Sequence, residues 1–98
     1  MTKTEFFQIA KSYNLSIGQS LMGPVARYNH KTVMVLWENS LNPVLNSAII
    51  FEPERLNISN ISTLSKHLPN IIKYFKEKQV QEKLNQIKED FVWHIMNA

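Results

Sequence analysis

The longest unbroken run of hydrophobic residues lies between Thr32 and Glu38, in the sequence Thr-Val-Met-Val-Leu-Trp-Glu. Its content of β-branched residues and tryptophan is typical of a β-strand. Both alternating sets are hydrophobic: Val33, Val35 and Trp37 on one side, and Met34 and Leu36 on the other. Since side chains alternate between the two faces of a strand, each face needs cover, and we predict a central strand here.

The N-terminal residues predict an amphipathic helix. Thr2 and Glu5 have the spacing of a capping box, in which each side chain accepts a hydrogen bond from the backbone of the other residue. Hydrophobic residues then recur at helical spacing, at Phe6, Ile9, Ala10 and Tyr13. Asn14 suits the left-handed conformation that ends many helices. The next segment, Ser16–Gly23, contains both glycines and is predicted to be a loop.

Two further strands are expected beside the central one. Val25–Tyr28 follows Pro24, and the polar residues Asn29, His30 and Lys31 predict a tight turn into the central strand. Val44–Phe51 is the third predicted strand, which Pro53 ends. The polar segment Arg55–Asn60 is predicted to be a linker.

The C-terminal third predicts helix, but its length leaves two possibilities open. Ser59 or Asn60 is suited to cap a short helix over Leu64–Leu68, and Pro69 is suited to open a second one. The 28 residues from 69 to 96 would span about 42 Å as a single helix, too long for a domain with a radius of gyration near 13 Å.

Hydrophobic periodicity in this region points the same way, because it defines two faces about 140° apart. The first face holds Leu68, Ile71, Ile72 and Phe75, and the second holds Val80, Leu84, Ile87, Phe91 and Ile95. Either the helix breaks near Lys78 and Gln79 to form an internal hairpin, or its second half packs on a second copy or a partner.

The predicted fold is therefore an α+β single domain covering residues 1–98, with the element order α-β-β-β-α-α. A three-stranded antiparallel sheet packs with the N-terminal helix and with a long or broken C-terminal helical segment. The N-terminal residues do not resemble a signal peptide, and no hydrophobic run approaches the roughly 20 residues of a membrane span. We therefore expect a cytoplasmic protein with no membrane association.

Residues suited to catalysis or metal binding are few and scattered. The chain has no cysteine and one aspartate, Asp90. Glu52 and Glu54 lie at the end of a predicted strand, where solvated carboxylates are usual. The histidines at positions 30, 67 and 94 do not have the spacing of metal ligands. The sequence predicts neither an enzyme nor a cofactor or metal site.

The net charge of +3 is compatible with a polyanionic partner, so a small basic nucleic-acid-binding protein or a regulator of the phage or plasmid type is the alternative function. The basic candidates for such contacts are Arg27, His30, Lys31, Lys73 and Lys76. The lysines of the C-terminal segment alternate with acidic residues and do not gather on one helical face.

An excess of hydrophobic residues favours binding of another protein, with a homodimer as one possibility. The predicted sheet-side surface comprises Met34, Leu36, Trp37, Ile49 and Phe51. The predicted dimer or partner seam comprises Leu84, Ile87, Phe91, Trp93 and Ile95.

The first half of the chain resembles the specificity chaperones of type III secretion. The resemblance rests on an amphipathic helix with Phe6, Phe7, Ile9 and Ala10, followed by a loop and three strands: Val25–Tyr28, Val33–Glu38 and one ending before Pro53. It implies a dimeric, non-catalytic protein that holds an unfolded segment of a secreted client against its sheet and helices.

Overall fold

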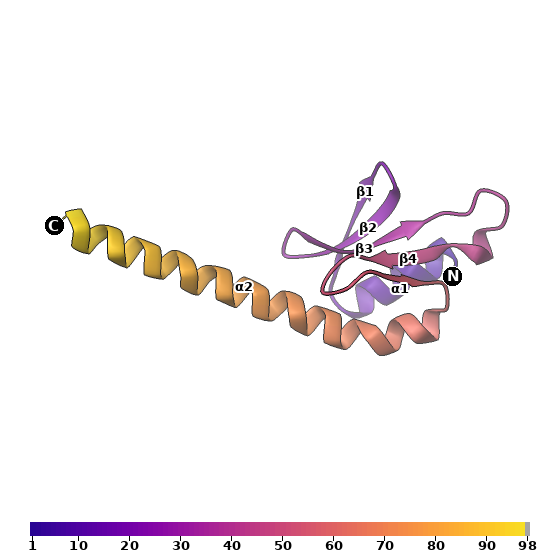
Figure 1. The fold of residues 1–98 in the computed structure, drawn as a ribbon. Coiled ribbons are helices and arrows are strands. Elements are labelled where there is room, and N and C mark those ends of the chain that lie inside the picture. The colour runs from indigo at the N-terminus through magenta and orange to yellow at the C-terminus, as the bar shows by residue number, and fades with distance from the viewer. Residues whose placement is uncertain (98) are drawn as a thin grey trace.

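The computed structural model describes the backbone of residues 1–97 and the side chains of residues 1–88. Its elements are α1 (Lys3–Ser12), β1 (Ser16–Ser20), β2 (Gly23–Tyr28), β3 (Lys31–Trp37), the 3-10 helix η1 (Pro43–Leu45), β4 (Ser47–Ile50), β5 (Leu56–Ile58) and α2 (Ile61–Asn97). The strands form one antiparallel sheet in sequence order, with β3 at its centre (Figure 1). The α+β class is confirmed, whereas the predicted three strands are five.

The first unpredicted strand is β1, in the segment expected to be a loop. It pairs with β2 along its full length, from Ser16 opposite Arg27 to Ser20 opposite Gly23. The strand is polar and lies at the sheet edge, so it lacks the hydrophobic alternation that marks a half-buried strand. Gly23 has φ +138°, and a Cβ there would collide with the Leu36 carbonyl oxygen. A glycine is therefore required where β1 turns into β2.

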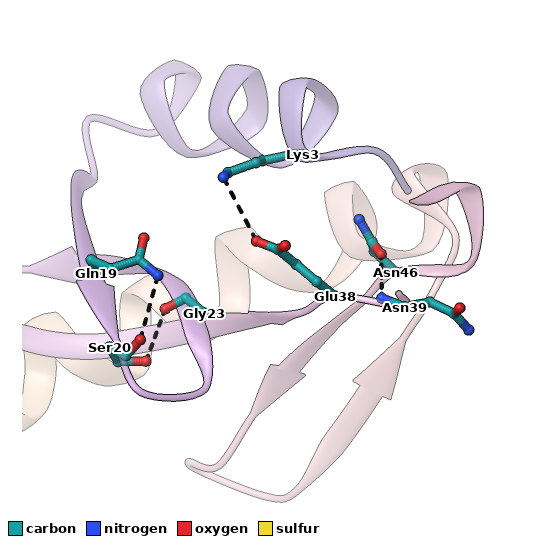
Figure 2. A network of polar contacts seen from close by, with 7 residues as sticks. All are labelled: Lys3, Gln19, Ser20, Gly23, Glu38, Asn39 and Asn46. Carbon is teal, nitrogen blue, oxygen red and sulfur yellow. Dashed lines mark hydrogen bonds and ion pairs between the residues drawn. The ribbon is translucent and has the colours of Figure 1, made fainter. Parts of the chain in front are cut away.

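The second unpredicted strand is β5, in the segment expected to be a linker. It has only three residues, and its central residue Asn57 pairs with Ile49 of β4. β4 itself begins at Ser47, later than predicted, because residues 43–45 form η1. The buried Asn46 side chain holds this connection in place by accepting a hydrogen bond from the Asn39 amide at 2.6 Å (Figure 2). Lys3 of α1 forms an ion pair with Glu38 in the same region, at 3.7 Å.

The predicted helix start and turns are confirmed. The Thr2 hydroxyl accepts from the Glu5 amide at 3.2 Å, and the Glu5 carboxylate accepts from the Thr2 amide at 2.9 Å. This second hydrogen bond lowers the pKa of Glu5 below its usual value. Asn14 takes the left-handed conformation, and Asn29 and His30 do the same in the β2–β3 turn.

The hydrophobic core lies between the sheet and the two helices, which pack on the same sheet face. The sheet contributes Ala26, Val33, Met34, Leu36, Ala48, Ile50 and Ile58; α1 contributes Phe6 and Ala10; α2 contributes Leu64, Leu68, Ile71, Ile72 and Phe75. All of these side chains are buried. The residues predicted to form the first hydrophobic face of the C-terminal segment therefore cover the sheet.

Proline at position 69 lies inside α2 and not at its start. The helix begins at Ile61, where the Asn60 side chain accepts from the amides of Ser62 and Thr63, as predicted for a cap at this position. Since proline has no amide hydrogen, the Ser65 carbonyl lacks its usual helical donor. The Tyr13 hydroxyl lies 3.5 Å from that carbonyl and donates to it. The residue that caps the end of α1 thus supplies a donor to this carbonyl of α2.

The two-helix arrangement predicted by a break near Lys78 and Gln79 is wrong, because α2 continues to Asn97. At 1.5 Å per residue, its 37 residues span about 55 Å. The chain measures 63 × 27 × 22 Å, with a radius of gyration of 17.1 Å, because the second half of α2 projects beyond the sheet (Figure 1). The compactness of an average domain was the wrong guide here. Within the described residues, no helix is hydrophobic enough over a sufficient length to span a membrane.

Candidate protein-binding surfaces

The central strand β3 divides its hydrophobic residues between two different environments. Met34 and Leu36 face the helices and have no exposed surface. Val35 lies on the opposite side of the strand, directly between Val25 of β2 and Ile49 of β4. These three side chains are buried but do not belong to the cluster beneath the helices. They form a short hydrophobic row on the sheet face that carries no helix, which we call the open face.

Two large aromatic side chains flank this row. Trp37 is two residues after Val35 on β3, and Phe51 is two residues after Ile49 on the chain that leaves β4. Alternation along an extended chain places both on the open face. Their exposed fractions are 52% and 48%, respectively. The open face therefore presents partly exposed aromatic surface on either side of a hydrophobic centre.

A third side of the row is occupied by Arg27. Its guanidinium group lies over Gly18 of β1, so close that a Cβ on this glycine would come 2.7 Å from Nη1 and 3.3 Å from the Val25 side chain. The arginine thus packs flat against the sheet beside Val25. Gly18 leaves the space for it, which gives this edge of the open face a positive charge.

The predicted sheet-side surface is therefore split between the two faces. Trp37, Ile49 and Phe51 lie on the open face, whereas Met34 and Leu36 belong to the core and are inaccessible. The physical reason is the two-residue repeat of a strand, which places Met34 and Leu36 on one face and Val35 and Trp37 on the other. Val33, predicted to share a side with Val35 and Trp37, lies in the core instead, because the register between β2 and β3 shifts there. Both sets are hydrophobic, so the sequence alone did not show which one the helices cover.

The second exposed hydrophobic surface lies on the projecting half of α2. Val80, Leu84 and Ile87 follow one another at intervals of four and three residues, with exposed fractions of 57%, 48% and 63%. Leu84 and Ile87 belong to the predicted seam. The other predicted seam residues, Phe91, Trp93 and Ile95, lie outside the described side chains. We call Val80, Leu84 and Ile87 the distal stripe.

Polar contacts mark the point where α2 leaves the sheet. The Gln79 side chain donates to the carbonyls of Tyr28 and Asn29, and it accepts from the Asn29 amide group at 3.0 Å. Lys78 donates to the Glu52 carboxylate at 2.8 Å. This hydrogen bond lowers the pKa of Glu52 and raises that of Lys78. The position at which a break was predicted is thus where the described side chains of α2 make their last hydrogen bonds to the rest of the domain.

The predicted nucleic-acid contacts are spread over several parts of the molecule. His30 lies in the β2–β3 turn and Lys31 begins β3, beside Lys83 and Glu82 of α2. Arg27 packs on the open face, as described above. Lys73 forms a surface ion pair with Glu77 at 4.0 Å, and Lys76 is exposed on α2. The arrangement mixes acidic and basic groups and presents no single phosphate-binding face among these five residues.

A shallow groove between α1 and the start of α2 has a volume of about 600 Å³ and is open to solvent. Its polar lining includes Glu5, Gln8, Ser62 and Lys66. Among the residues that the structure describes, no three histidine, cysteine, aspartate or glutamate side chains are grouped as metal ligands would be.

Several exposed hydrophobic residues were not predicted as binding residues. They lie in the β1–β2 turn and in the connection from β3 to β4: Leu21, Met22, Leu41, Val44 and Leu45. Both segments leave the sheet at the end where Trp37 lies, since β2 begins and β3 ends there. They occur as two adjacent pairs and one single residue, so no periodic pattern distinguished them.

Comparison with protein-family models, with curated proteins and with solved structures finds no match to this chain. The resemblance to type III secretion chaperones therefore stays a prediction.

Proposed function

We propose that this protein is a non-catalytic binding module that acts stoichiometrically by holding a segment of another protein against the open face of its sheet. The observation that carries the proposal is the exposure of Trp37 and Phe51 on either side of the row formed by Val25, Val35 and Ile49. Aromatic residues around a hydrophobic centre are enriched at protein interfaces, where they contribute large contact areas.

The chemistry of the open face favours a partner segment that is hydrophobic and carries a negative charge. Trp37 and Phe51 offer apolar contact, and the guanidinium of Arg27 lies at the edge of the same face. An acidic group on the partner would pair with this arginine while the neighbouring apolar side chains occupy the centre. The Arg27 side chain is already held against Gly18, so little of its conformational freedom would be lost on binding.

An affinity capture with quantitative mass spectrometry tests the proposal. The wild-type protein, Trp37→Ser and Phe51→Ser are used as baits, with Ile87→Ser as the matched control, since Ile87 is exposed on the projecting half of α2, away from the open face. We expect both open-face variants to lose the same captured protein at least tenfold and the control to retain it. Equal capture by all four baits would contradict the proposal.

Fluorescence then tests direct contact with the captured protein. The chain has two tryptophans, so Trp93→Phe leaves Trp37 as the single reporter. Because Trp37 is about half exposed, burial against a partner should shift its emission to shorter wavelength. A saturable blue shift supports binding at the open face, and an unchanged spectrum in a complex that does form places the contact elsewhere.

A further inference from the structure

We propose that α2 forms an antiparallel homodimer, in which the distal stripe of one copy packs against the distal stripe of a second copy. This interface is separate from the open face, so its test is independent of the test of the proposed function. The occupant follows from the geometry of the stripe and from the charges beside it.

The distal stripe points away from the sheet of its own chain. At 100° per residue, Val80, Leu84 and Ile87 centre about 140° around the helix axis from the residues that cover the sheet, such as Leu68 and Phe75. The exposure of the stripe residues agrees with this orientation. Lys73 and Glu77 lie on the same side of α2 as the stripe. A second helix is therefore able to lie along the stripe and past these two residues without contacting the sheet.

Packing against a second helix would stabilise the projecting half of α2, since most helical stability in proteins comes from packing of a hydrophobic face. Beyond Gln79, the described side chains of α2 are all exposed. The spacing of Val80, Leu84 and Ile87 is that of alternating d, a and d positions of a heptad repeat, which packs against another helix.

An antiparallel alignment gives complementary neighbours throughout this segment. With Leu84 opposite Ile87 of the second copy, Val80 lies opposite position 91, a phenylalanine, and Glu77 lies opposite position 94, a histidine. Positions 91 and 94 enter this alignment through their place in the sequence and in the helix, which continues to Asn97. The sequence thus gives four layers of hydrophobic positions in this register, with a glutamate position and a histidine position at each end.

The charges at the sides of the stripe distinguish the antiparallel from the parallel arrangement. In the antiparallel alignment, Lys83 flanks the stripe on the same side as position 90 of the second copy, two residues along the helix from the position level with it. Position 90 is the only aspartate of the chain. In a parallel pair, Lys83 would instead flank the stripe beside Lys88 of the second copy. Glu77 would face Glu77 of the second copy. Like charges at these positions oppose pairing and opposite charges favour it. We therefore infer the antiparallel form.

Sedimentation equilibrium tests whether the stripe mediates dimerisation. We expect the wild-type chain to associate to a dimer with increasing concentration and Leu84→Asp to remain a monomer. Gln86→Asp is the matched control, because it adds the same charge in the same turn on the side opposite the stripe, and it should dimerise as the wild type does. A wild-type monomer at about 100 µM, one hundred times a 1 µM dissociation constant, would overturn the proposal, as would a dimeric Leu84→Asp.

Charge reversal gives opposite results for the two orientations. In the antiparallel dimer, Lys83→Glu faces an aspartate and should weaken association at least tenfold, and adding Asp90→Lys should restore it. In a parallel dimer, Lys83→Glu would face Lys88 and strengthen association. Strengthening therefore overturns the antiparallel proposal. Far-ultraviolet circular dichroism of each variant separates weakened association from loss of the fold.

A distance measurement decides the orientation directly. The chain has no cysteine, so Asn70→Cys accepts a single spin label. About the centre of the antiparallel alignment, the two copies of position 70 are separated by 31 helical residues, or about 46 Å along the axis. In a parallel pair they would be roughly 10 Å apart, the distance between packed helices. A dipolar distance near 46 Å supports the proposal, and a short distance overturns it.

Discussion

The two halves of α2 place their described hydrophobic side chains in opposite environments. In the first half, Leu64, Leu68, Ile71, Ile72 and Phe75 are buried against the sheet and α1. In the second half, the stripe residues Val80, Leu84 and Ile87 are about half exposed. One continuous helix thus stabilises the domain with its first turns and presents an uncovered hydrophobic surface with its later ones.

This contrast shows why hydrophobic content alone does not identify a core. The two stripes differ in their angle around the helix and in what lies beside them, and only the first one meets the sheet. The attachment of Gln79 to the β2–β3 turn marks the boundary between them. The second stripe is therefore available to bind another molecule without unfolding of the domain.

Truncation of one leucine in each half gives the largest expected difference. Leu68→Ala removes a fully buried side chain beneath α2 and should lower the free energy of unfolding by about 2–5 kcal/mol, because it leaves a cavity. Leu84→Ala should change that free energy by less than about 0.5 kcal/mol in dilute protein, since Leu84 does not contact the core. Urea denaturation at low concentration measures both, and equal losses would contradict the contrast.

Removal of the N-terminal cap of α2 should lower the free energy of unfolding by an intermediate amount, because the cap stabilises the half of the helix that packs on the sheet. The Asn60 side chain accepts from two amides at the start of α2, so Asn60→Ala should cost about 0.5–2 kcal/mol. Ser59→Ala is the matched control, since its side chain forms none of these bonds. Urea denaturation compares the two variants. If both lost the same stability, the cap would not be what anchors the first half of the helix.

The smallest expected effect is electrostatic and lies at the boundary between the halves. The hydrogen bond from Lys78 lowers the pKa of Glu52, so the stability it contributes is present above the usual glutamate pKa and is lost as pH falls through the lowered value. The raised pKa of Lys78 means that the same contact is also lost as pH rises through that value.

Glu52→Gln tests this contact by its pH profile. The stability difference from wild type should be visible near pH 7 and should disappear in acid, once Glu52 is protonated. Glu54→Gln is the control, because it removes the same charge two residues along the chain without an ion pair to Lys78. Thermal denaturation across pH measures the profiles. A difference that persists unchanged in strong acid would exclude the ion pair as its cause.

The sequence predicted those elements that carry a strong local signal. The capping box of Thr2 and Glu5, the left-handed Asn14 and the turn at Asn29 and His30 were all predicted and are present. These features depend on contacts within a few residues, which a sequence displays directly. The central strand was found for the same reason, because hydrophobic and β-branched residues are concentrated in it.

Features that depend on distant contacts were missed. The polar strand β1 and the three-residue β5 exist through pairing with β2 and β4, which local sequence does not show. Continuation of α2 through Pro69 coincides with a hydrogen bond from Tyr13, more than fifty residues earlier. Which of Val35 and Met34 would face the helices was likewise decided by tertiary packing. The open face could therefore not be separated from the core in advance.

Hydrogen exchange along α2, measured at low and high protein concentration, tests the contrast between its two halves most directly. We predict that amides of residues 64–75 exchange slowly at both concentrations, whereas those of residues 80–88 exchange fast in dilute protein and become protected as the second copy covers the stripe. Equally slow exchange of both segments in dilute protein, or fast exchange of residues 80–88 at every concentration, would contradict the account.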